Sequence, residues 1–312
     1  MKRKVLLIIN PMAGKKKSQP ATFEIVEKFS HIGYDFTVKT TTCPGDATNI
    51  VKKFGEGFDL VVCCGGDGTL NETINGVMAL PCRLPVGYIP TGSTNDLAAT
   101  LGIPPNIRKA TQIILSRSAN MLDLGLFNTR YFCYVASFGV GTEISYTTSQ
   151  TMKNILGHSA YLLNGFVIKL AHLLRNIKPV HLRVDYDDGI IEDDFFFGAI
   201  SNASCVAGLF KYDEGDVRLD DGIFEMILVR RVSGAADAFE MFRKIQKREY
   251  DGDRLLYLKT RRAVITGEQA VPWTLDGEYG GEHDTVNFEV VPRAIKISSP
   301  QNPMFIGKER RE

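Results

Sequence analysis

The sequence predicts an α/β domain built on a parallel sheet, followed by a second domain of antiparallel strands. Residues 1–120 of the 312 alternate apolar runs of strand length with segments whose apolar residues recur at helical spacing. After Met121 this alternation stops, and short β-type runs separated by turn signals take over. A chain of this length is long enough to form two domains of typical size.

The first part reads in order as strand, helix, strand, helix. Strands are expected at 5–9, 35–39, 59–64 and 85–89, and helices at 20–32, 46–54 and directly after the glycine-rich segment 65–76. Asp46 can cap the second helix and Gly55 can end it. This order predicts a parallel sheet with helices on both faces, in which ligands bind beyond the carboxyl ends of the strands.

The second part predicts an antiparallel sandwich or barrel. Its expected strands are 123–128, 131–137, 180–186, 190–200, 223–229, 255–259, 262–266 and 286–291. Two helices interrupt them, one at 155–176 and one that Ser233 can cap.

Composition excludes several classes of protein. The net charge of +1 gives no large field for nucleic acid or an anionic membrane. No apolar stretch reaches the ~18 residues that span a bilayer, and the first apolar run stops at Asn10, which favours a strand over a signal peptide. The six cysteines lack CxxC spacing and the five histidines are scattered, so a reduced cytoplasm is expected, without disulfides or a zinc site.

The most informative segment is Gly-Gly-Asp-Gly-Thr-Leu-Asn-Glu-Thr-Ile-Asn-Gly, residues 65–76. It joins a strand end to a helix start, and its glycines are expected to adopt φ > 0 and approach a ligand closely. The amides of such a turn favour an anion. Because Asp67 would repel a bare phosphate, a cation such as Mg²⁺ is expected between them. The alternative is a tight turn with a solvated Asp67.

Three further strand ends carry polar or flexible residues. The first is followed by Asn10, Pro11 and Gly14 and then by Lys15–Lys17, and the second by Thr40–Thr42. After the fourth comes Pro-Thr-Gly-Ser-Thr-Asn-Asp, residues 90–96, in which Asp96 is expected near Asp67. Asn95-Asp96 can also be an ordinary helix N-cap, and the two interpretations are compatible.

Together these residues resemble the diacylglycerol kinase catalytic family, which includes bacterial lipid kinases and the sphingosine and ceramide kinases. NAD kinases and phosphofructokinases carry similar Gly-Gly-Asp-Gly-Thr turns, but the continuation through Asn71, Glu72 and Asn75-Gly76 favours the lipid kinases. Ser93 stands where the family usually has Thr. The resemblance implies these nucleotide-binding residues: Asn10, Pro11, Gly14, Thr41, Gly65, Gly66, Asp67, Gly68, Thr69, Asn71, Glu72, Ser93, Asn95 and Asp96.

The resemblance also implies the fold: an ATP-binding α/β domain, NAD kinase- and phosphofructokinase-like, of residues 1–120 plus about 296–312, and a β-sandwich lipid-substrate domain of residues 121–295. Val-Pro-Trp-Thr-Leu-Asp-Gly-Glu, residues 271–278, is similar to the family's Val-Pro-x-x-x-Asp-Gly-Glu. A lipid hydroxyl attacks phosphate better when a carboxylate takes its proton, so Asp276 or Glu278 is the expected base, with Asp67 the third catalytic residue. A hairpin with solvated carboxylates is the alternative.

Residues 218–223 resemble the family's structural Mg²⁺ loop, which implies the Asp221 carboxylate and the carbonyls of Arg218 and Ile223 as ligands. The flanking residues Gly208-Leu209 and Asp216-Val217 depart from the family pattern.

The prediction is therefore a soluble, cytoplasmic ATP- and Mg²⁺-dependent lipid kinase, with diacylglycerol as the leading substrate and no nucleic-acid partner. It would contact the membrane surface peripherally through one of three basic clusters: Lys15–Lys17, Lys169 with Arg175, or Arg243, Lys244, Lys247 and Arg248. The oligomeric state is open, a homodimer being one alternative. The alternative functions are a kinase of NAD or a polyol, and a nucleotide-binding regulator without turnover.

Overall fold

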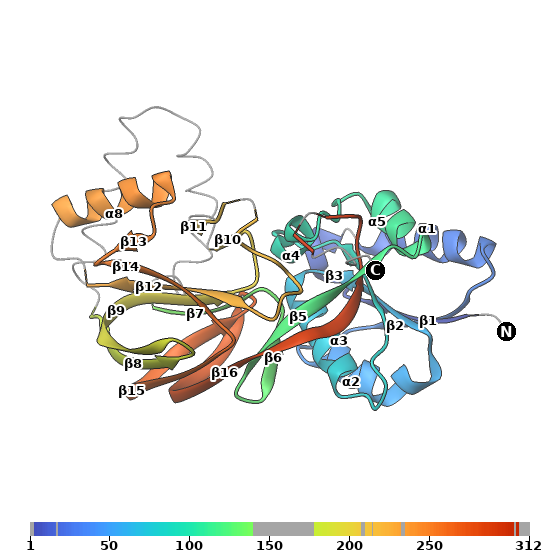
Figure 1. Ribbon diagram of the computed structural model, residues 1–312. Helices are drawn as coiled ribbons and strands as arrows, with labels where there is room; N and C mark the ends of the chain where they lie inside the picture. The colour runs from blue at the N-terminus through green and yellow to red at the C-terminus, as the bar shows by residue number, and fades with distance from the viewer. Residues whose placement is uncertain are drawn as a thin grey trace, which may run out of the picture. The chain divides into compact units, whose positions relative to one another are not determined.

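The computed structural model of the chain describes residues 3–16, 18–139, 178–206, 210–213, 215–231, 235–302 and 304–305. The expected helix at 155–176, the cap Ser233, Gly208-Leu209, Lys17, Lys169 and Arg175 lie outside the described residues. The chain forms two compact units (Figure 1). The first unit is Met1–Leu124, Arg218–Gly222 and Val291–Glu312, and the second unit is Gly125–Val217 and Ile223–Val290.

The first unit is built on a parallel sheet. Strand β1 (Lys4–Ile9) pairs in parallel with β2 (Asp35–Thr40) and β3 (Leu60–Gly65), and β3 pairs in parallel with β4 (Val86–Pro90). Ile297, near the end of β16 (Glu278–Ser298), pairs in parallel with Val86. The apolar runs of β1, β3 and β4 are buried, as strands covered on both faces must be. The strands expected at 5–9, 35–39, 59–64 and 85–89 are confirmed, and with them the α/β class.

Helices cover both faces of this sheet (Figure 1). Helices α1 (Ser18–His31), α4 (Asp96–Thr100) and α5 (Ile107–Leu115) lie on one face, and α2 (Asp46–Phe54) and α3 (Asp67–Met78) on the other. Two short 3-10 turns, η1 (Ala13–Lys16) and η2 (Gly55–Gly57), complete the unit. No helix was expected at α5. The cap Asn106, which accepts a hydrogen bond from the Lys109 N–H at 3.1 Å, was the missed signal.

The expectation that Asp46 caps α2 is wrong. The N-cap is Gly45, in the left-handed region at φ 86°, and Asp46 is the first helical residue. Its carboxylate accepts hydrogen bonds from the Thr42 hydroxyl and N–H, both at 2.6 Å, and from the Cys43 N–H at 3.1 Å. These bonds, the Thr42 hydroxyl first, lower the pKa of Asp46 to about 2.

This shift predicts a pH-dependent contribution to stability. The pKa of Asp46 is lowered on folding, so its contribution is present above pH ~4 and is lost as the pH falls toward 2. Asp46→Ala should lower the urea midpoint at pH 7 and have a shrinking effect between pH 4 and 2. Urea unfolding of both proteins across that range measures the difference. A difference that stays constant with pH would contradict the assignment.

The second unit is an antiparallel sheet that closes on itself. Strands β7 (Val135–Gly139), β9 (Gly189–Ser201), β8 (Val180–Tyr186) and β15 (Arg262–Leu275) pair in a ring, because β9 and β15 each pair with both β7 and β8. Beyond β9, strands β12 (Phe224–Arg230), β14 (Leu255–Thr260) and β13 (Asp251–Gly252) extend the sheet. The antiparallel pairing expected for this part is confirmed.

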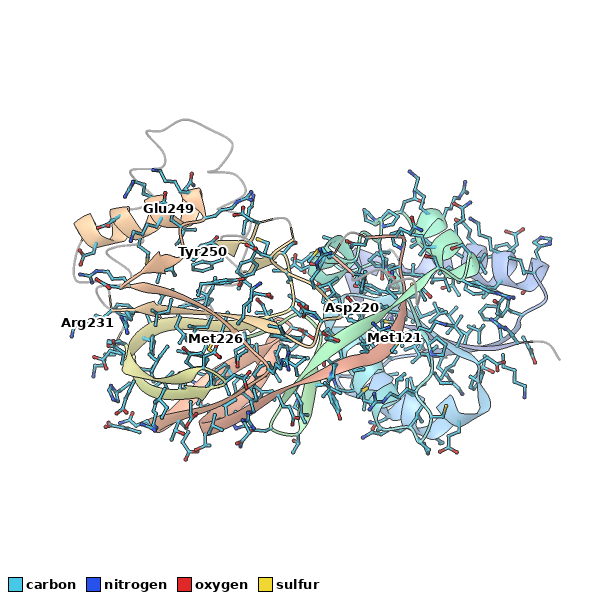
Figure 2. The ribbon with its side chains drawn as sticks, in the orientation of Figure 1. Met121, Asp220, Met226, Arg231, Glu249 and Tyr250 are labelled. Carbon is cyan, nitrogen blue, oxygen red and sulfur yellow. The ribbon has the colours of Figure 1, made fainter. Side chains whose placement is uncertain are left out.

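The remaining elements are β5 (Ala119–Phe127), which begins in the first unit, β6 (Arg130–Phe132), the pair β10 (Cys205–Val206) and β11 (Phe210–Lys211), and helix α8 (Ala235–Lys247). The core of the second unit is apolar and rich in aromatic rings. Phe127 and Phe138 pack against Trp273, and Met226 on β12 lies among these core side chains (Figure 2).

Two expectations about this part need correction. Strands β15 and β16 are far longer than the expected 262–266 and 286–291, because bulges carry their pairing past the polar residues after Thr266. Arg218–Gly222, assigned above to the second domain, packs within the first unit. There the Asp123 N–H donates to the Leu219 carbonyl at 2.8 Å, and the Leu219 N–H donates to the Met304 carbonyl at 2.8 Å.

Candidate functional site

The loops that follow β1, β3 and β4 meet at the carboxyl ends of these strands. The Asn10 side-chain amide donates to the Thr69 hydroxyl at 3.0 Å, and this contact joins the first loop to the start of α3. The Thr91 N–H donates to the Gly65 carbonyl at 2.8 Å, so the loops after β3 and β4 also touch. Ligands bind at this edge of a parallel sheet.

The glycines of the 65–76 segment serve close packing instead of the expected positive φ. Gly65 lies in β3, Gly66 is the N-cap of α3 at φ −95°, and Gly68 lies in α3. A Cβ on Gly65 would lie 2.6 Å from the Thr69 side chain. A Cβ on Gly92 would lie 2.6 Å from the Cα of Gly66. The two loops can therefore approach only because both backbones lack side chains there.

Gly14 does have the conformation that favours glycine. Its φ is +52°, and a Cβ built on it would lie 1.8 Å from the Thr91 carbonyl oxygen. The Asn-Pro-x-x-Gly loop is thus in backbone contact with the loop after β4. Pro11 lies in this loop, and the Asn10 side-chain oxygen accepts a hydrogen bond from the Met12 N–H at 2.9 Å, which stabilises the turn.

The residues of the loops after β1, β3 and β4, around Asn10, Asp67 and Asp96, form the strand-end cluster. Asp67 lies at its centre, in the first turn of α3. Its Oδ2 accepts a hydrogen bond from the Asp96 N–H at 2.9 Å and lies 3.4 Å from the Thr94 hydroxyl. Asp96 therefore lies beside Asp67, as expected. A carboxylate in the first turn is stabilised by the amino end of the helix dipole.

Glu72 is aimed elsewhere, although the resemblance implied a role in nucleotide binding. Its two carboxylate oxygens accept hydrogen bonds from the Gly45 N–H at 2.7 Å and the Ala47 N–H at 3.1 Å. These are N–H groups at the start of α2, which lack partners within the helix. Asn71 is buried and accepts hydrogen bonds from Asn75. Glu72 thus links α3 to α2.

This geometry predicts a stability effect for Glu72. Glu72→Ala removes a charged acceptor from two N–H groups, so it should lower the free energy of unfolding by about 2 kcal/mol. Glu72→Gln keeps one oxygen and should lose less. Urea unfolding measures both. Unchanged stability together with a raised KM for ATP would contradict this structural role and support a role of Glu72 in nucleotide binding.

Thr41 is buried at the end of β2, where its N–H donates to the Ile9 carbonyl at 2.9 Å. Ser93 is exposed in the loop after β4, and Asn95 follows as the N-cap of α4 at φ 53° without a side-chain cap bond. Sequence reasoning missed Tyr88 and Thr94, which both contact Asp67. A tyrosine in an otherwise apolar strand, near that strand's carboxyl end, was the available signal.

The two acids of the second unit have opposite environments. Asp276 and Gly277 form a two-residue turn between β15 and β16 with φ 51° and 83°, as in a type I′ hairpin. Asp276 is buried, and its carboxylate accepts hydrogen bonds from the N–H groups of Cys133, Tyr134 and Val135 at 2.7, 2.9 and 3.1 Å. Glu278 is exposed. The turn therefore separates the two side chains.

The expected Mg²⁺ loop has Arg218 and Asp221 in the first unit, and Ile223 is the first residue of the second unit's next segment. Asp123 fastens this loop: its carboxylate accepts hydrogen bonds from the Gly222 N–H at 2.6 Å and from the Arg293 N–H. Burial, with the nearby Asp221 and Asp220, raises the pKa of Asp123 to about 6. Across the part of the chain that the structure describes, no group of three or more His, Cys, Asp or Glu residues is arranged to hold a metal ion.

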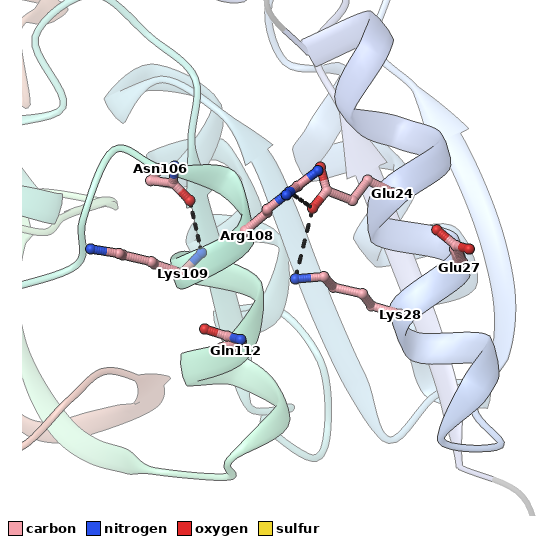
Figure 3. Close-up of a pocket in the computed structure, with 7 residues that line it drawn as sticks. All are labelled: Glu24, Glu27, Lys28, Asn106, Arg108, Lys109 and Gln112. Atoms are coloured by element: carbon pink, nitrogen blue, oxygen red, sulfur yellow. Dashed lines mark hydrogen bonds and ion pairs between the residues drawn. The ribbon is translucent and has the colours of Figure 1, made fainter.

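A groove between α1 and α5 lies apart from these residues (Figure 3). Its walls carry both signs of charge, and Glu24 bridges Arg108 at 2.6 Å and Lys28 at 3.7 Å. Such paired surface charges give no preference for one class of ligand. Among the described helices, none has the length and apolarity needed to cross a membrane.

Comparison with known proteins agrees with these motifs. The diacylglycerol kinase catalytic domain family matches residues 4–127. A diacylglycerol kinase from Bacillus subtilis (strain 168) is 31% identical over 281 residues, covering 89% of this chain and 91% of its own length. A diacylglycerol kinase from Staphylococcus carnosus (strain TM300) is 30% identical, covering 97% of each chain. A solved putative diacylglycerol kinase from Bacillus anthracis has a TM-score of 0.77 at 24% identity, covering 96% of this chain and 97% of its own, which supports a common fold.

Proposed function

Because this chain belongs to the diacylglycerol kinase catalytic family and is therefore a kinase, we propose that it transfers the γ-phosphate of ATP to a lipid hydroxyl, with diacylglycerol as the leading acceptor. The observation that carries this proposal is the cluster around Asp67. It combines a carboxylate, closely approaching glycine backbones and the amino ends of two helices at the carboxyl edge of a parallel sheet. Glycine-rich backbone supports close approach of phosphates, and the carboxylate suits a bridging cation.

We assign nucleotide binding to the first unit. The loops of Asn10–Gly14, Gly65–Thr69 and Ser93–Asp96 would hold the phosphates, with Thr41 beside them. Asp67 would orient Mg²⁺ through its carboxylate or through water. The ion, when bound, neutralises charge on the transferred phosphoryl group. The structural Mg²⁺ loop of Arg218, Asp221 and Ile223 stays a proposal, supported by its all-oxygen donors.

We assign the proton acceptor to Glu278. The carboxylate of Asp276 is already engaged by three backbone N–H groups, whereas Glu278 is exposed and free of that structural task. Glu278 would take the proton of the lipid hydroxyl while the oxygen of that hydroxyl attacks the γ-phosphorus of ATP, and ADP would leave. This division gives the two acids of one motif different roles.

The test is phosphoryl transfer from radiolabelled ATP to a panel of acceptors. Diacylglycerol, monoacylglycerol, ceramide, sphingosine and undecaprenol would be presented in mixed micelles, with NAD and glycerol in solution. Transfer to a lipid supports the proposal, and diacylglycerol should be the preferred acceptor. Transfer to NAD or glycerol alone would replace it with a soluble-substrate kinase, and no turnover with any acceptor would contradict it.

Peripheral contact with the cytoplasmic membrane surface is part of the same proposal, because a lipid acceptor resides there. At the end of α8, Lys247 lies 3.8 Å from Glu249, and Arg248, the residue after the helix, is paired with Asp213, so this basic cluster is partly neutralised. This cluster, Lys15–Lys17 and Lys169 with Arg175 all stay candidates for electrostatic docking. Vesicle binding that falls with added salt would support docking of this kind.

A further inference from the structure

Tyr88 is a buried titratable side chain beside Asp67 that the proposed chemistry does not use. It lies on β4, two residues before the strand ends, and its side chain is fully buried. Its hydroxyl lies 3.4 Å from Asp67 Oδ1 and 3.3 Å from Asn95 Oδ1. The Tyr88 hydroxyl is therefore a buried polar group in contact with the strand-end cluster.

The Tyr88 hydroxyl has one proton and faces two acceptors at similar, long distances. This is the geometry of a hydrogen bond shared between two oxygens. The Asn95 amide is held in place because its Nδ2 donates to the Gly92 carbonyl at 2.9 Å, which leaves Oδ1 toward the tyrosine. The anionic Asp67 oxygen is the stronger acceptor of the two.

The contacts of Asp67 divide between its two oxygens. Oδ2 is approached by the Asp96 N–H and the Thr94 hydroxyl, and Oδ1 by Tyr88. A carboxylate held from both sides cannot rotate freely about its terminal bond. The plane of the Asp67 carboxylate is therefore fixed in part by a residue that no bound nucleotide would reach.

We propose that Tyr88 is a positioning residue, which orients the Asp67 carboxylate for a divalent cation carried by the nucleotide. The proposal rests on the assignment of Asp67 to Mg·ATP binding. It adds that the orientation of the carboxylate, and not its charge alone, determines the affinity for Mg·ATP over metal-free ATP. Loss of the hydroxyl would let the carboxylate turn, while the aromatic ring continues to fill the core.

The test measures nucleotide binding by calorimetry, with ATP in excess Mg²⁺ and with ATP in EDTA. Tyr88→Phe should weaken Mg·ATP binding ~5- to 20-fold and leave binding of metal-free ATP within ~2-fold. In an Asp67→Asn background the same change should have no further effect on Mg·ATP binding, because Tyr88 acts through the carboxylate. Tyr34→Phe is the matched control: Tyr34 lies just before β2, at the opposite edge of the sheet, and its ring packs against Phe29.

Three results would overturn the proposal: Mg·ATP affinity unchanged in Tyr88→Phe, an equal loss of affinity with and without Mg²⁺, or the same loss in the Asp67→Asn background. The latter two would make the hydroxyl a general packing contact. Wild-type protein that binds neither form of ATP would overturn the proposed function along with it. Because wild-type binding is measured first, the two failures are distinguishable.

Discussion

Asp67→Asn should reduce kcat ~100- to 1,000-fold while the fold stays intact. Asparagine has the same shape and can still accept the Asp96 N–H, and the packing of the turn depends on Gly65, Gly66 and Gly92. What is lost is the negative charge that would hold Mg²⁺ and its waters at the phosphates. A loss of about 3–4 kcal/mol of transition-state stabilisation is typical of such a group. Steady-state kinetics at saturating lipid and ATP measures it.

Asp59→Asn supplies the matched control for this experiment. The Asp59 carboxylate accepts the Lys4 N–H at 2.8 Å, just before β3 and thus at the amino edge of the same sheet. A charge removed there should leave kcat within about 2-fold, since surface substitutions away from a site have small effects. Native circular dichroism with unchanged kcat in Asp67→Asn would remove this carboxylate from the mechanism.

The framework of the first unit could be predicted because its signals are local. Apolar runs such as Val5–Ile9 and Val61–Cys64 are fully buried strands, and each is followed by turn residues that the strand order brings to one edge. Parallel strands carry their carboxyl ends to that edge, so the proximity of Asp67 and Asp96 follows from sequence order and chain direction.

Side-chain direction could not be predicted in the same way. Glu72 lies five residues beyond Asp67 in the same motif, and its partners are the N–H groups of Gly45 and Ala47, about 25 residues earlier in the chain. From its apolar surroundings in the sequence, Tyr88 is expected to be a core residue. Only the pairing of β4 with β3 brings its hydroxyl to Asp67. In both cases the function of a side chain depends on a neighbouring element whose position the local sequence does not encode.

The acids of the Asp-Gly-Glu turn illustrate the same limit. Asp276 and Glu278 are equivalent carboxylates in sequence terms, two residues apart. Positive φ at Asp276 and Gly277 reverses the chain between the two acids. The N–H groups at Cys133–Val135 then donate hydrogen bonds to the Asp276 carboxylate, and Glu278 stays exposed. More than 140 residues separate Asp276 from Cys133 and Tyr134, so no local pattern reveals which acid is structural.

Alanine variants of these two acids should therefore fail in different ways. Glu278→Ala should lower kcat ~100- to 10,000-fold with an unchanged urea midpoint, because an exposed base is lost and no buried contact changes. Asp276→Ala should lower the free energy of unfolding by at least ~3 kcal/mol, because three N–H groups lose their acceptor in a buried setting. Asp276→Asn, which keeps one oxygen, should lie between the wild type and the alanine variant in stability.

The measurements are steady-state kinetics at saturating lipid and urea unfolding for each variant. The KM for ATP should change little in Glu278→Ala, since nucleotide binding is assigned to the first unit. Glu282→Ala controls for charge on the same hairpin, because Glu282 is an exposed residue of β16 paired with Pro272. If Glu278→Ala and Asp276→Asn both retain near wild-type kcat, the turn is structural throughout and the proton acceptor lies elsewhere, with Asp67 the next candidate. If Asp276→Asn loses kcat while its stability is unchanged, the roles of the two acids are reversed.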